Sequence, residues 1–146
     1  MFSNWFTPTE ENKVGFEDVL YTIQYPGSCL LINVLPSNEQ SCLIIGTIPM
    51  ENEEQEINHC LQNNDHSKII IIYGKHSCDA KVEEKYKQLK GLGFSRIFMF
   101  QGGLFEWLLL QDVYGKDIFP TTCNELDLLK FKGKSLFTSY LIQDLD

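Results

Sequence analysis

The amino-acid sequence predicts a single α/β domain of three layers, with a central, mostly parallel sheet of about five strands between helices. One observation is that segments of strand length alternate along the chain with segments of helical periodicity, which is typical of βαβ units. The other is that the strand segments are nearly continuous apolar runs, as in 29–35 (CLLINVL) and 68–73 (KIIIIY). Such runs indicate strands that are buried on both faces of a parallel sheet.

Four elements are expected in the first half of the chain: a helix at 15–24, strands at 29–35 and 41–48, and a helix at 51–61. In the first helix, Phe16, Val19 and Ile23 fall at helical spacing. Apolar runs of strand length predict both strands, and the second of them ends before Pro49. The second helix is acidic and has few apolar residues, which gather on one side.

Four more elements are expected in the second half: a strand at 68–73, a helix at 80–92, a strand at 96–100 and a helix at 104–111. The first of these strands contains four consecutive isoleucines, whose β-branched side chains favour a buried, pleated setting. The helix at 80–92 carries an apolar stripe of Val82, Tyr86, Leu89 and Leu92, and Gly93 is placed to end it as a C′ glycine.

The domain itself is expected to span residues 15–120. Residues 1–14 have no clear period and are interpreted as an N-terminal extension. Residues 121–146 are interpreted as a C-terminal helical extension that packs on the domain, in two pieces that break near Gly133. No repeat or Pro/Gly-rich linker indicates a further boundary.

The composition excludes several classes of partner. The formal net charge is −8, whereas binding to nucleic-acid phosphates requires a Lys/Arg surface. No run reaches the roughly 18 apolar residues of a membrane span. The five cysteines are odd in number and form no CxxC pair, and the N-terminus lacks the pattern of a secretory signal. Free thiols in a reducing, cytoplasmic compartment are therefore expected.

The ligand site of such a sheet is expected beyond the carboxyl ends of its strands, in the loops after Val34, Tyr73 and Phe100. Four segments around these loops form an ordered pattern: 31–34 (LINV), 46–49 (GTIP), 70–73 (IIIY) with the six-residue loop and helix that follow, and 93–107 (GFSRIFMFQGGLFEW). In this order and spacing they resemble the rhodanese-like superfamily of sulfurtransferases and non-catalytic relatives. The resemblance covers residues 15–112 and implies a rhodanese-like domain whose active-site loop is 74–79.

Four positions depart from the pattern of the catalytic members. In the family the catalytic cysteine opens the loop, a place that Gly74 takes here, and Asp79 replaces the Arg or Lys that usually ends it. Asn33 and Leu35 replace the family's Asp and Arg. A persulfide-forming cysteine must be a thiolate, and Gly74 offers no sulfur while Asp79 adds negative charge. The resemblance therefore implies that residue 74 supports no ordinary sulfurtransferase activity.

Cys78, late in the same loop, supports an alternative. The positive end of the helix that follows would stabilise its thiolate, and His76 could act as its base. The competing interpretation is an exposed, unreactive thiol beside an Asp whose charge opposes thiolate formation. The activity of the related cell-cycle phosphatases is excluded, because their C-x5-R pattern counted from Cys78 reaches Glu84.

No metal or cofactor is expected. His59, Cys60 and His66 match no familiar zinc spacing. The glycine pair at 102–103 lacks the GxGxxG pattern of a phosphate loop and is interpreted as a tight turn before a helix. Asp79 is interpreted first as the N-cap of the following helix.

The segment 103–115 (GLFEWLLLQDVYG) is unusually apolar for a surface helix. Most of its side chains are interpreted as core, partly covered by the tail. If Phe105 or Leu109 is exposed, the segment instead offers a face for a protein partner or for a second copy of the chain.

The sequence therefore favours a non-catalytic binding or regulatory module. The alternative is a sulfurtransferase or thiol-redox enzyme that uses Cys78 with His76. The candidate site consists of the loop residues Gly74, Lys75, His76, Ser77, Cys78 and Asp79, supported by Asn33, Gln101, Gly102 and Gly103.

Overall fold

The structure is a computed structural model, and it describes residues 12–137. Ten elements follow one another in the described part of the chain. They are β1 (Lys13–Val14), α1 (Phe16–Gln24), β2 (Cys29–Asn33), the 3-10 helix η3 (Ser37–Glu39), α2 (Met50–Gln62), β3 (Ile69–Tyr73), α3 (Ala80–Gly91), β4 (Ile97–Phe100), α4 (Gly103–Tyr114) and the 3-10 helix η4 (Leu128–Phe131).

The four strands form one parallel sheet in the order β1-β4-β3-β2. Its register pairs Asn33 with Tyr73 and Tyr73 with Phe100. The carboxyl ends of the three longer strands therefore meet at one edge, as expected for a site built from the loops that follow them. The predicted parallel α/β architecture is confirmed, with four strands in the described residues.

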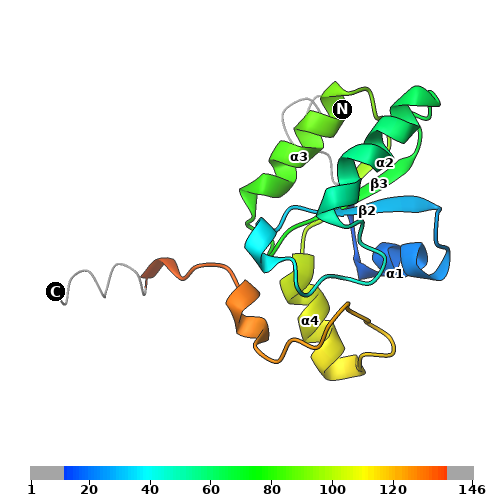
Figure 1. The fold of residues 1–146 in the computed structure, drawn as a ribbon. Helices are drawn as coiled ribbons and strands as arrows, with labels where there is room; N and C mark the ends of the chain where they lie inside the picture. The colour runs from blue at the N-terminus through cyan, green and yellow to red at the C-terminus, as the bar shows by residue number, and fades with distance from the viewer. Residues whose placement is uncertain (1–11, 138–146) are drawn as a thin grey trace, which may run out of the picture.

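Helices cover both faces of the sheet, which makes the three layers seen in Figure 1. Side chains alternate along β3, so Ile70 and Ile72 face one way while Ile71 and Tyr73 face the other. The first face packs on α2 and α3 through Ile57, Cys60, Val82 and Leu89. The second face packs on α1 and α4 through Val19, Leu104, Trp107 and Leu108. A strand buried on both sides needs a continuous apolar run, which explains the isoleucines.

The prediction of a strand at 41–48 is wrong. This segment makes only isolated bridges, Leu31 with Thr47 and Ile44 with Thr121. A turn interrupts it, because the amide of Thr47 donates to the carbonyl of Ile44 (3.1 Å) and Gly46 has a φ of +90°. The run is apolar because Cys42, Leu43 and Ile44 are buried in the core, and an irregular segment achieves this burial without joining the sheet.

The strand β1 was missed by the sequence analysis. Lys13 pairs with Met99 and Val14 with Phe100, so residues 13–14 extend the sheet at its β4 edge. A strand of two residues has no periodicity that a sequence could reveal.

The ends of the helices agree in part with the prediction. Gly93 follows α3 with a φ of +102°, as a C′ glycine does. Leu92, however, is 43% exposed and does not belong to the apolar stripe of α3. No helix within residues 12–137 is long and apolar enough to cross a membrane.

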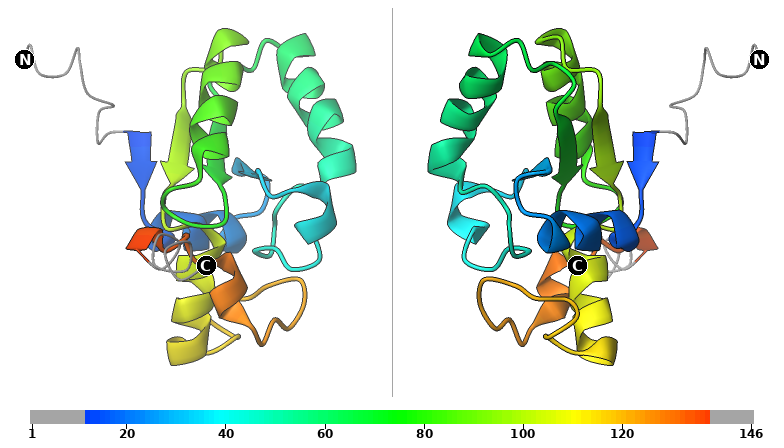
Figure 2. Two further views of the ribbon diagram at one scale, coloured as in Figure 1. Left: turned by 90° about the vertical axis from the view of Figure 1, so that its left-hand side faces the viewer. Right: turned by 90° about the vertical axis from the view of Figure 1, so that its right-hand side faces the viewer.

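The C-terminal segment lies against the body of the domain. Its first predicted helical piece is the short η4, which packs beside α4 (Figure 2). Phe131 at the end of η4 is buried in the core shared by α1 and α4. The second predicted piece lies mainly outside the described residues.

Candidate functional site

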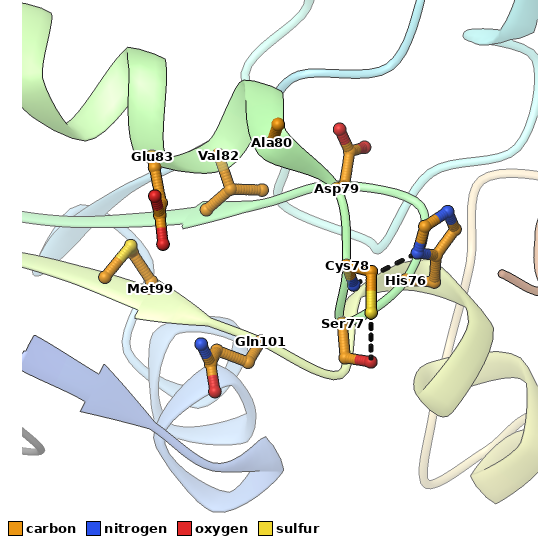
Figure 3. Close-up of a pocket in the computed structure, with 9 residues that line it drawn as sticks. All are labelled: His76, Ser77, Cys78, Asp79, Ala80, Val82, Glu83, Met99 and Gln101. Carbon is orange, nitrogen blue, oxygen red and sulfur yellow. Dashed lines mark hydrogen bonds between the residues drawn. The ribbon is translucent and has the colours of Figure 1, made fainter.

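The loop 74–79 connects the carboxyl end of β3 to α3, as predicted. A pocket of about 220 Å³ opens between this loop, the first turns of α3 and the end of β4 (Figure 3). Its lining comprises His76, Ser77, Cys78, Asp79, Ala80, Val82, Glu83, Met99 and Gln101.

The backbone of the loop is held by the N-terminus of α4. The amide of Leu104 donates to the carbonyl of Gly74 (2.9 Å), and the amide of Phe105 donates to the carbonyl of Lys75 (2.8 Å). Gly103 has a φ of +65°, and a Cβ there would stand 2.7 Å from the Gly74 oxygen. The glycine pair predicted to form a turn thus allows α4 to approach the loop.

The side chain of Asp79 occupies the inside of the loop. Its Oδ1 accepts a hydrogen bond from the amide of Lys81 (3.1 Å), which confirms Asp79 as the N-cap of α3. Its Oδ2 accepts from the amide of Lys75 (3.1 Å). A Cβ added to Gly74 would lie 2.5 Å from Asp79 Oδ2 and 2.9 Å from Val82 Cγ2. The carboxylate therefore fills the space that any side chain at residue 74 would need.

His76 and Cys78 lie together, but the imidazole contacts the backbone of Cys78 and not its thiol. The amide of Cys78 donates to His76 Nδ1 (3.1 Å), so this ring nitrogen carries no proton. The exposed Cys78 Sγ has Ser77 Oγ as its neighbour at 3.9 Å (Figure 3). In this arrangement His76 orders the loop and its Nδ1 is not available to accept a proton from the thiol.

The charge that faces the pocket is acidic. Asp79 lines it at the N-cap of α3 and Glu83 lines it in the first turn, and the carboxylate of Glu83 points toward the side of Met99 and Gln101 (Figure 3). The ammonium of Lys75 pairs with Glu39 Oε2 (2.8 Å) on η3, and Lys75 is not among the residues that line the pocket. The wall thus offers the carboxylate of Glu83 to a ligand, since both oxygens of Asp79 accept backbone amides and the imidazole of His76 turns away (Figure 3).

Asn33 is placed for a structural task outside this pocket. Its Oδ1 accepts from the amide of Leu35 (3.0 Å) and from Gln40 Nε2 (2.7 Å), and its Nδ2 donates to Gln40 Oε1 (3.1 Å). It lines a separate hollow of about 280 Å³ between α2 and α3. Of the supporting residues, only Gln101 lines the pocket, while Gly102 and Gly103 begin α4 beside the loop.

Glu83 and Met99 line the pocket and were not predicted. The spacing of Glu83, four residues after the N-cap Asp79, could have predicted that it lies beside the loop, because residues four apart are neighbours on a helix surface. Met99 faces the same side of the sheet as the isoleucines that pack on α3. Met99 lines the pocket because α3 packs over β4, and this packing could not be predicted from the sequence.

The three residues considered as metal ligands have different neighbours and do not face one another. His59 Nε2 lies 3.1 Å from Asn63 Nδ2, Cys60 is on the buried side of α2, and the ring of His66 packs near Phe94. Among residues 12–137, no group of three His, Cys, Asp or Glu side chains is arranged to hold a metal ion.

The apolar helix α4 is only partly core. Leu104, Trp107 and Leu108 are buried, but Leu109 is 41% exposed. Val113 and Tyr114 at the end of the helix are also exposed. Part of this segment is core as expected, and the exposure of Leu109 meets the stated condition for a partner face, which stays a prediction.

A family model for the rhodanese-like domain matches residues 17–110, more than half of the chain. The chain belongs to the rhodanese-like domain family. The matched range includes β2, β3 and β4, the loop 74–79 and most of α4. The family resemblance inferred from the sequence is thus confirmed. No curated protein gives a significant sequence match.

Three solved structures share this rhodanese-like fold. The BH2092 protein from Bacillus halodurans is 15% identical with a TM-score of 0.57, and 90% of each chain is covered. A crystal structure of the Alr3790 protein from Anabaena sp. is 16% identical with a TM-score of 0.54, covering 80% of this chain and 97% of that one. The solution structure of the rhodanese-like domain of Alr3790 is 17% identical with a TM-score of 0.55, covering 77% and 80%. At these identities the likeness concerns the fold alone.

Proposed function

We propose that this rhodanese-like domain is a non-catalytic binding module whose pocket receives a basic side chain of a protein partner. The observation that carries the proposal is the position of Asp79. Its carboxylate fills the space in front of Gly74 and accepts the amide hydrogen of Lys75.

Sulfur transfer at residue 74 is incompatible with this arrangement. The reaction needs a thiolate whose charge is stabilised by surrounding amide groups. Gly74 has no sulfur, and the carboxylate of Asp79 uses the amide of Lys75 and places a negative charge in the same space. The loop is present between β3 and α3 but lacks the cysteine thiolate that would carry the sulfur.

The pocket itself suits one side chain. Its volume of about 220 Å³ is smaller than the roughly 300–1,000 Å³ of common small-molecule sites. The carboxylate of Glu83 in its wall favours a cation, such as the ammonium of lysine or the guanidinium of arginine, and the nearby charge of Asp79 adds to the negative potential. These charges disfavour an anionic ligand, including a sulfur donor such as thiosulfate.

The absence of catalysis is tested by incubating the protein with thiosulfate and cyanide and measuring thiocyanate. We expect no turnover above buffer, and an intact mass without an added sulfur atom. Cys78→Ser should behave like the unmodified chain in both measurements. Turnover that disappears in Cys78→Ser would contradict the proposal.

The binding pocket is tested by NMR titration of the isotopically labelled protein with N-acetyl-arginine amide and, separately, with thiosulfate. We expect the amide signals of Ser77 and Gln101 to shift saturably with the arginine derivative only. Glu83→Gln should weaken this binding several-fold, while Glu84→Gln on the adjacent position of α3 should leave it unchanged. Saturable shifts with thiosulfate alone would overturn the assignment of the ligand.

A thiol enzyme that uses Cys78 is the second candidate, and the exposure of this thiol in the pocket wall favours it. Such an enzyme would add sulfur or oxygen to Cys78 without requiring Gly74. Mass analysis after thiosulfate treatment distinguishes the two, because only the enzyme forms a persulfide that is confined to Cys78.

A further inference from the structure

Two segments far apart in the sequence run antiparallel beside the sheet. Ile44 forms a bridge with Thr121. The amide of Thr122 donates to the carbonyl of Leu43 (2.8 Å), and the amide of Ile45 donates to the carbonyl of Pro120 (3.2 Å). In this register each step back from Ile44 is matched by a step forward from Thr121, so Cys42 lies opposite Cys123.

The position of Cys42 and Cys123 in this antiparallel ladder suits a disulfide. Because the two hydrogen bonds join residue 43 to 122 and residue 45 to 120, the pairs 44–121 and 42–123 are the non-hydrogen-bonded positions of the ladder. At such positions the Cα atoms lie about 4.5 Å apart and the side chains are closest. A disulfide requires a Cα separation of roughly 4.4–6.8 Å.

The thiol of Cys42 contacts the backbone of Cys123. Cys42 Sγ lies 3.6 Å from the carbonyl oxygen of Cys123, and both thiols are free in this structure. Cys42 is fully buried, whereas Cys123 is half-buried. Burial, followed by the hydrogen bond and charge of Cys123, raises the pKa of the Cys42 thiol to about 11. The accessible member of the pair is therefore Cys123.

We propose that Cys42 and Cys123 are a redox-active pair that forms a reversible disulfide when the protein meets a peroxide. The sulfur of Cys123 attacks hydrogen peroxide and becomes a sulfenic acid with release of one water. Cys42 Sγ then attacks the sulfenic sulfur, and the hydroxyl leaves with the Cys42 proton as a second water. The two thiols lose two electrons and two protons in total, and the peroxide takes up both and is reduced to two molecules of water.

The other cysteines are placed differently. Cys60 lies on the buried side of α2 over the opposite face of the sheet, Cys78 is exposed in the loop, and Cys29 begins β2. All five cysteines of the chain lie within the described residues. The selectivity of the cross-link thus follows from the register of the two segments.

The disulfide would fasten the C-terminal segment to the domain. Beyond Cys123 the chain places Phe131 in the core and brings Gly133 beside the imidazole of His76, where an added Cβ would be 3.7 Å from Nδ1. The link would therefore hold the segment that covers one side of the candidate loop. A reversible disulfide of this kind is compatible with a reducing compartment, where such bonds are transient.

The proposal is tested on the full chain by treatment with hydrogen peroxide, alkylation of remaining thiols, and mass spectrometry of non-reduced peptides. We expect loss of two hydrogen atoms, a cross-linked peptide joining residues 42 and 123, and reversal by dithiothreitol. The oxidised protein should unfold at a midpoint about 5–15 °C above that of the reduced protein, because the link closes a long loop.

Cys123→Ser should abolish the cross-link, and Cys60→Ser, a matched substitution of a buried thiol, should leave it intact. Two results would overturn the proposal: oxygen added irreversibly to Cys123 without a cross-link, or a cross-link that joins Cys78 instead. The measurement on the unmodified chain decides the question even if a variant fails to fold.

Discussion

The Oδ2 atom of Asp79 stands 2.5 Å from the point that a Cβ on Gly74 would occupy. Gly74→Ala must therefore displace the carboxylate or the neighbouring Val82, and such overpacking typically destabilises a protein by about 1–3 kcal/mol. We expect this loss in urea-induced unfolding. Gly91→Ala is the matched control, because a Cβ at Gly91 meets no atom within 4 Å and helical Ala is favoured over Gly.

A double-mutant cycle isolates the contact between the two residues. Asp79→Ala alone should cost about 1 kcal/mol through the lost N-cap of α3. In that background, Gly74→Ala should cost less than it does in the unmodified chain, with a coupling of about 0.5–3 kcal/mol. Additive losses would show that the carboxylate does not limit the size of residue 74.

Tyr73 links the sheet to the irregular segment 41–48. Its hydroxyl accepts from the amide of Ile44 (3.1 Å) and lies 2.7 Å from Thr47 Oγ1, and the whole side chain is buried. Tyr73→Phe leaves the buried amide of Ile44 without its partner, which should cost about 1–3 kcal/mol in unfolding free energy.

The control for this prediction is Tyr114→Phe, since Tyr114 is exposed at the end of α4. That substitution should change the unfolding free energy by less than about 0.5 kcal/mol. Equal effects of the two changes would mean that the hydroxyl of Tyr73 does not fix the segment.

The sequence predicted the parts of the fold that depend on local periodicity. The isoleucines of β3 and the N-cap at Asp79 follow from residues that are adjacent along the chain. The apolar run at 41–48 was misinterpreted because burial alone does not distinguish a strand from an irregular core segment. The contact between Cys42 and Cys123 spans 81 positions, so periodicity carries no information about it.

The residues of the candidate site are brought together only in part. His76 to Asp79 and Gln101 line one pocket because parallel strands bring their carboxyl ends together. Asn33 lies at the same edge of the sheet, but its amide is occupied by Gln40, a partner that no spacing rule would suggest. The obstruction of Gly74 by Asp79 likewise depends on how the loop folds back.

Glu106, in the first turn of α4, should make stability depend on pH. Its partial burial, and then the charge of Glu17, raise its pKa above the ordinary value of 4.5. As pH rises through 4.5, the unfolded chain releases this proton first, so the folded state loses stability until Glu106 is ionised in both states. Glu106→Gln should therefore raise the unfolding midpoint at neutral pH.

Measuring the unfolding midpoint of Glu106→Gln across pH distinguishes an electrostatic effect from a change in packing. The gain from Glu106→Gln should shrink as pH falls and vanish below about pH 4, where the carboxyl is protonated in both states. Glu17→Gln should give a smaller gain in the same direction, because it removes only the second cause of the raised pKa. A gain that is constant across pH would contradict the electrostatic explanation.

The C-terminal segment should contribute to the stability of the domain mainly through one buried aromatic side chain. Phe131 is 2% exposed and packs in the core of α1 and α4, whereas Leu129 in the same 3-10 helix is 58% exposed. Phe131→Ala should cost about 3–5 kcal/mol, since it removes a buried aromatic side chain and leaves a cavity. Leu129→Ala should change the unfolding free energy by less than about 0.5 kcal/mol.

Unfolding in urea provides both values, and the alkylation rate of Cys78 by iodoacetamide gives a second readout at the loop. Gly133, two residues after Phe131, lies beside His76, so releasing the anchor should free this side of the loop and speed the modification of Cys78. Leu129→Ala should leave the rate unchanged. If Phe131→Ala destabilises the domain without altering this rate, the segment supports the core but does not shield the candidate site.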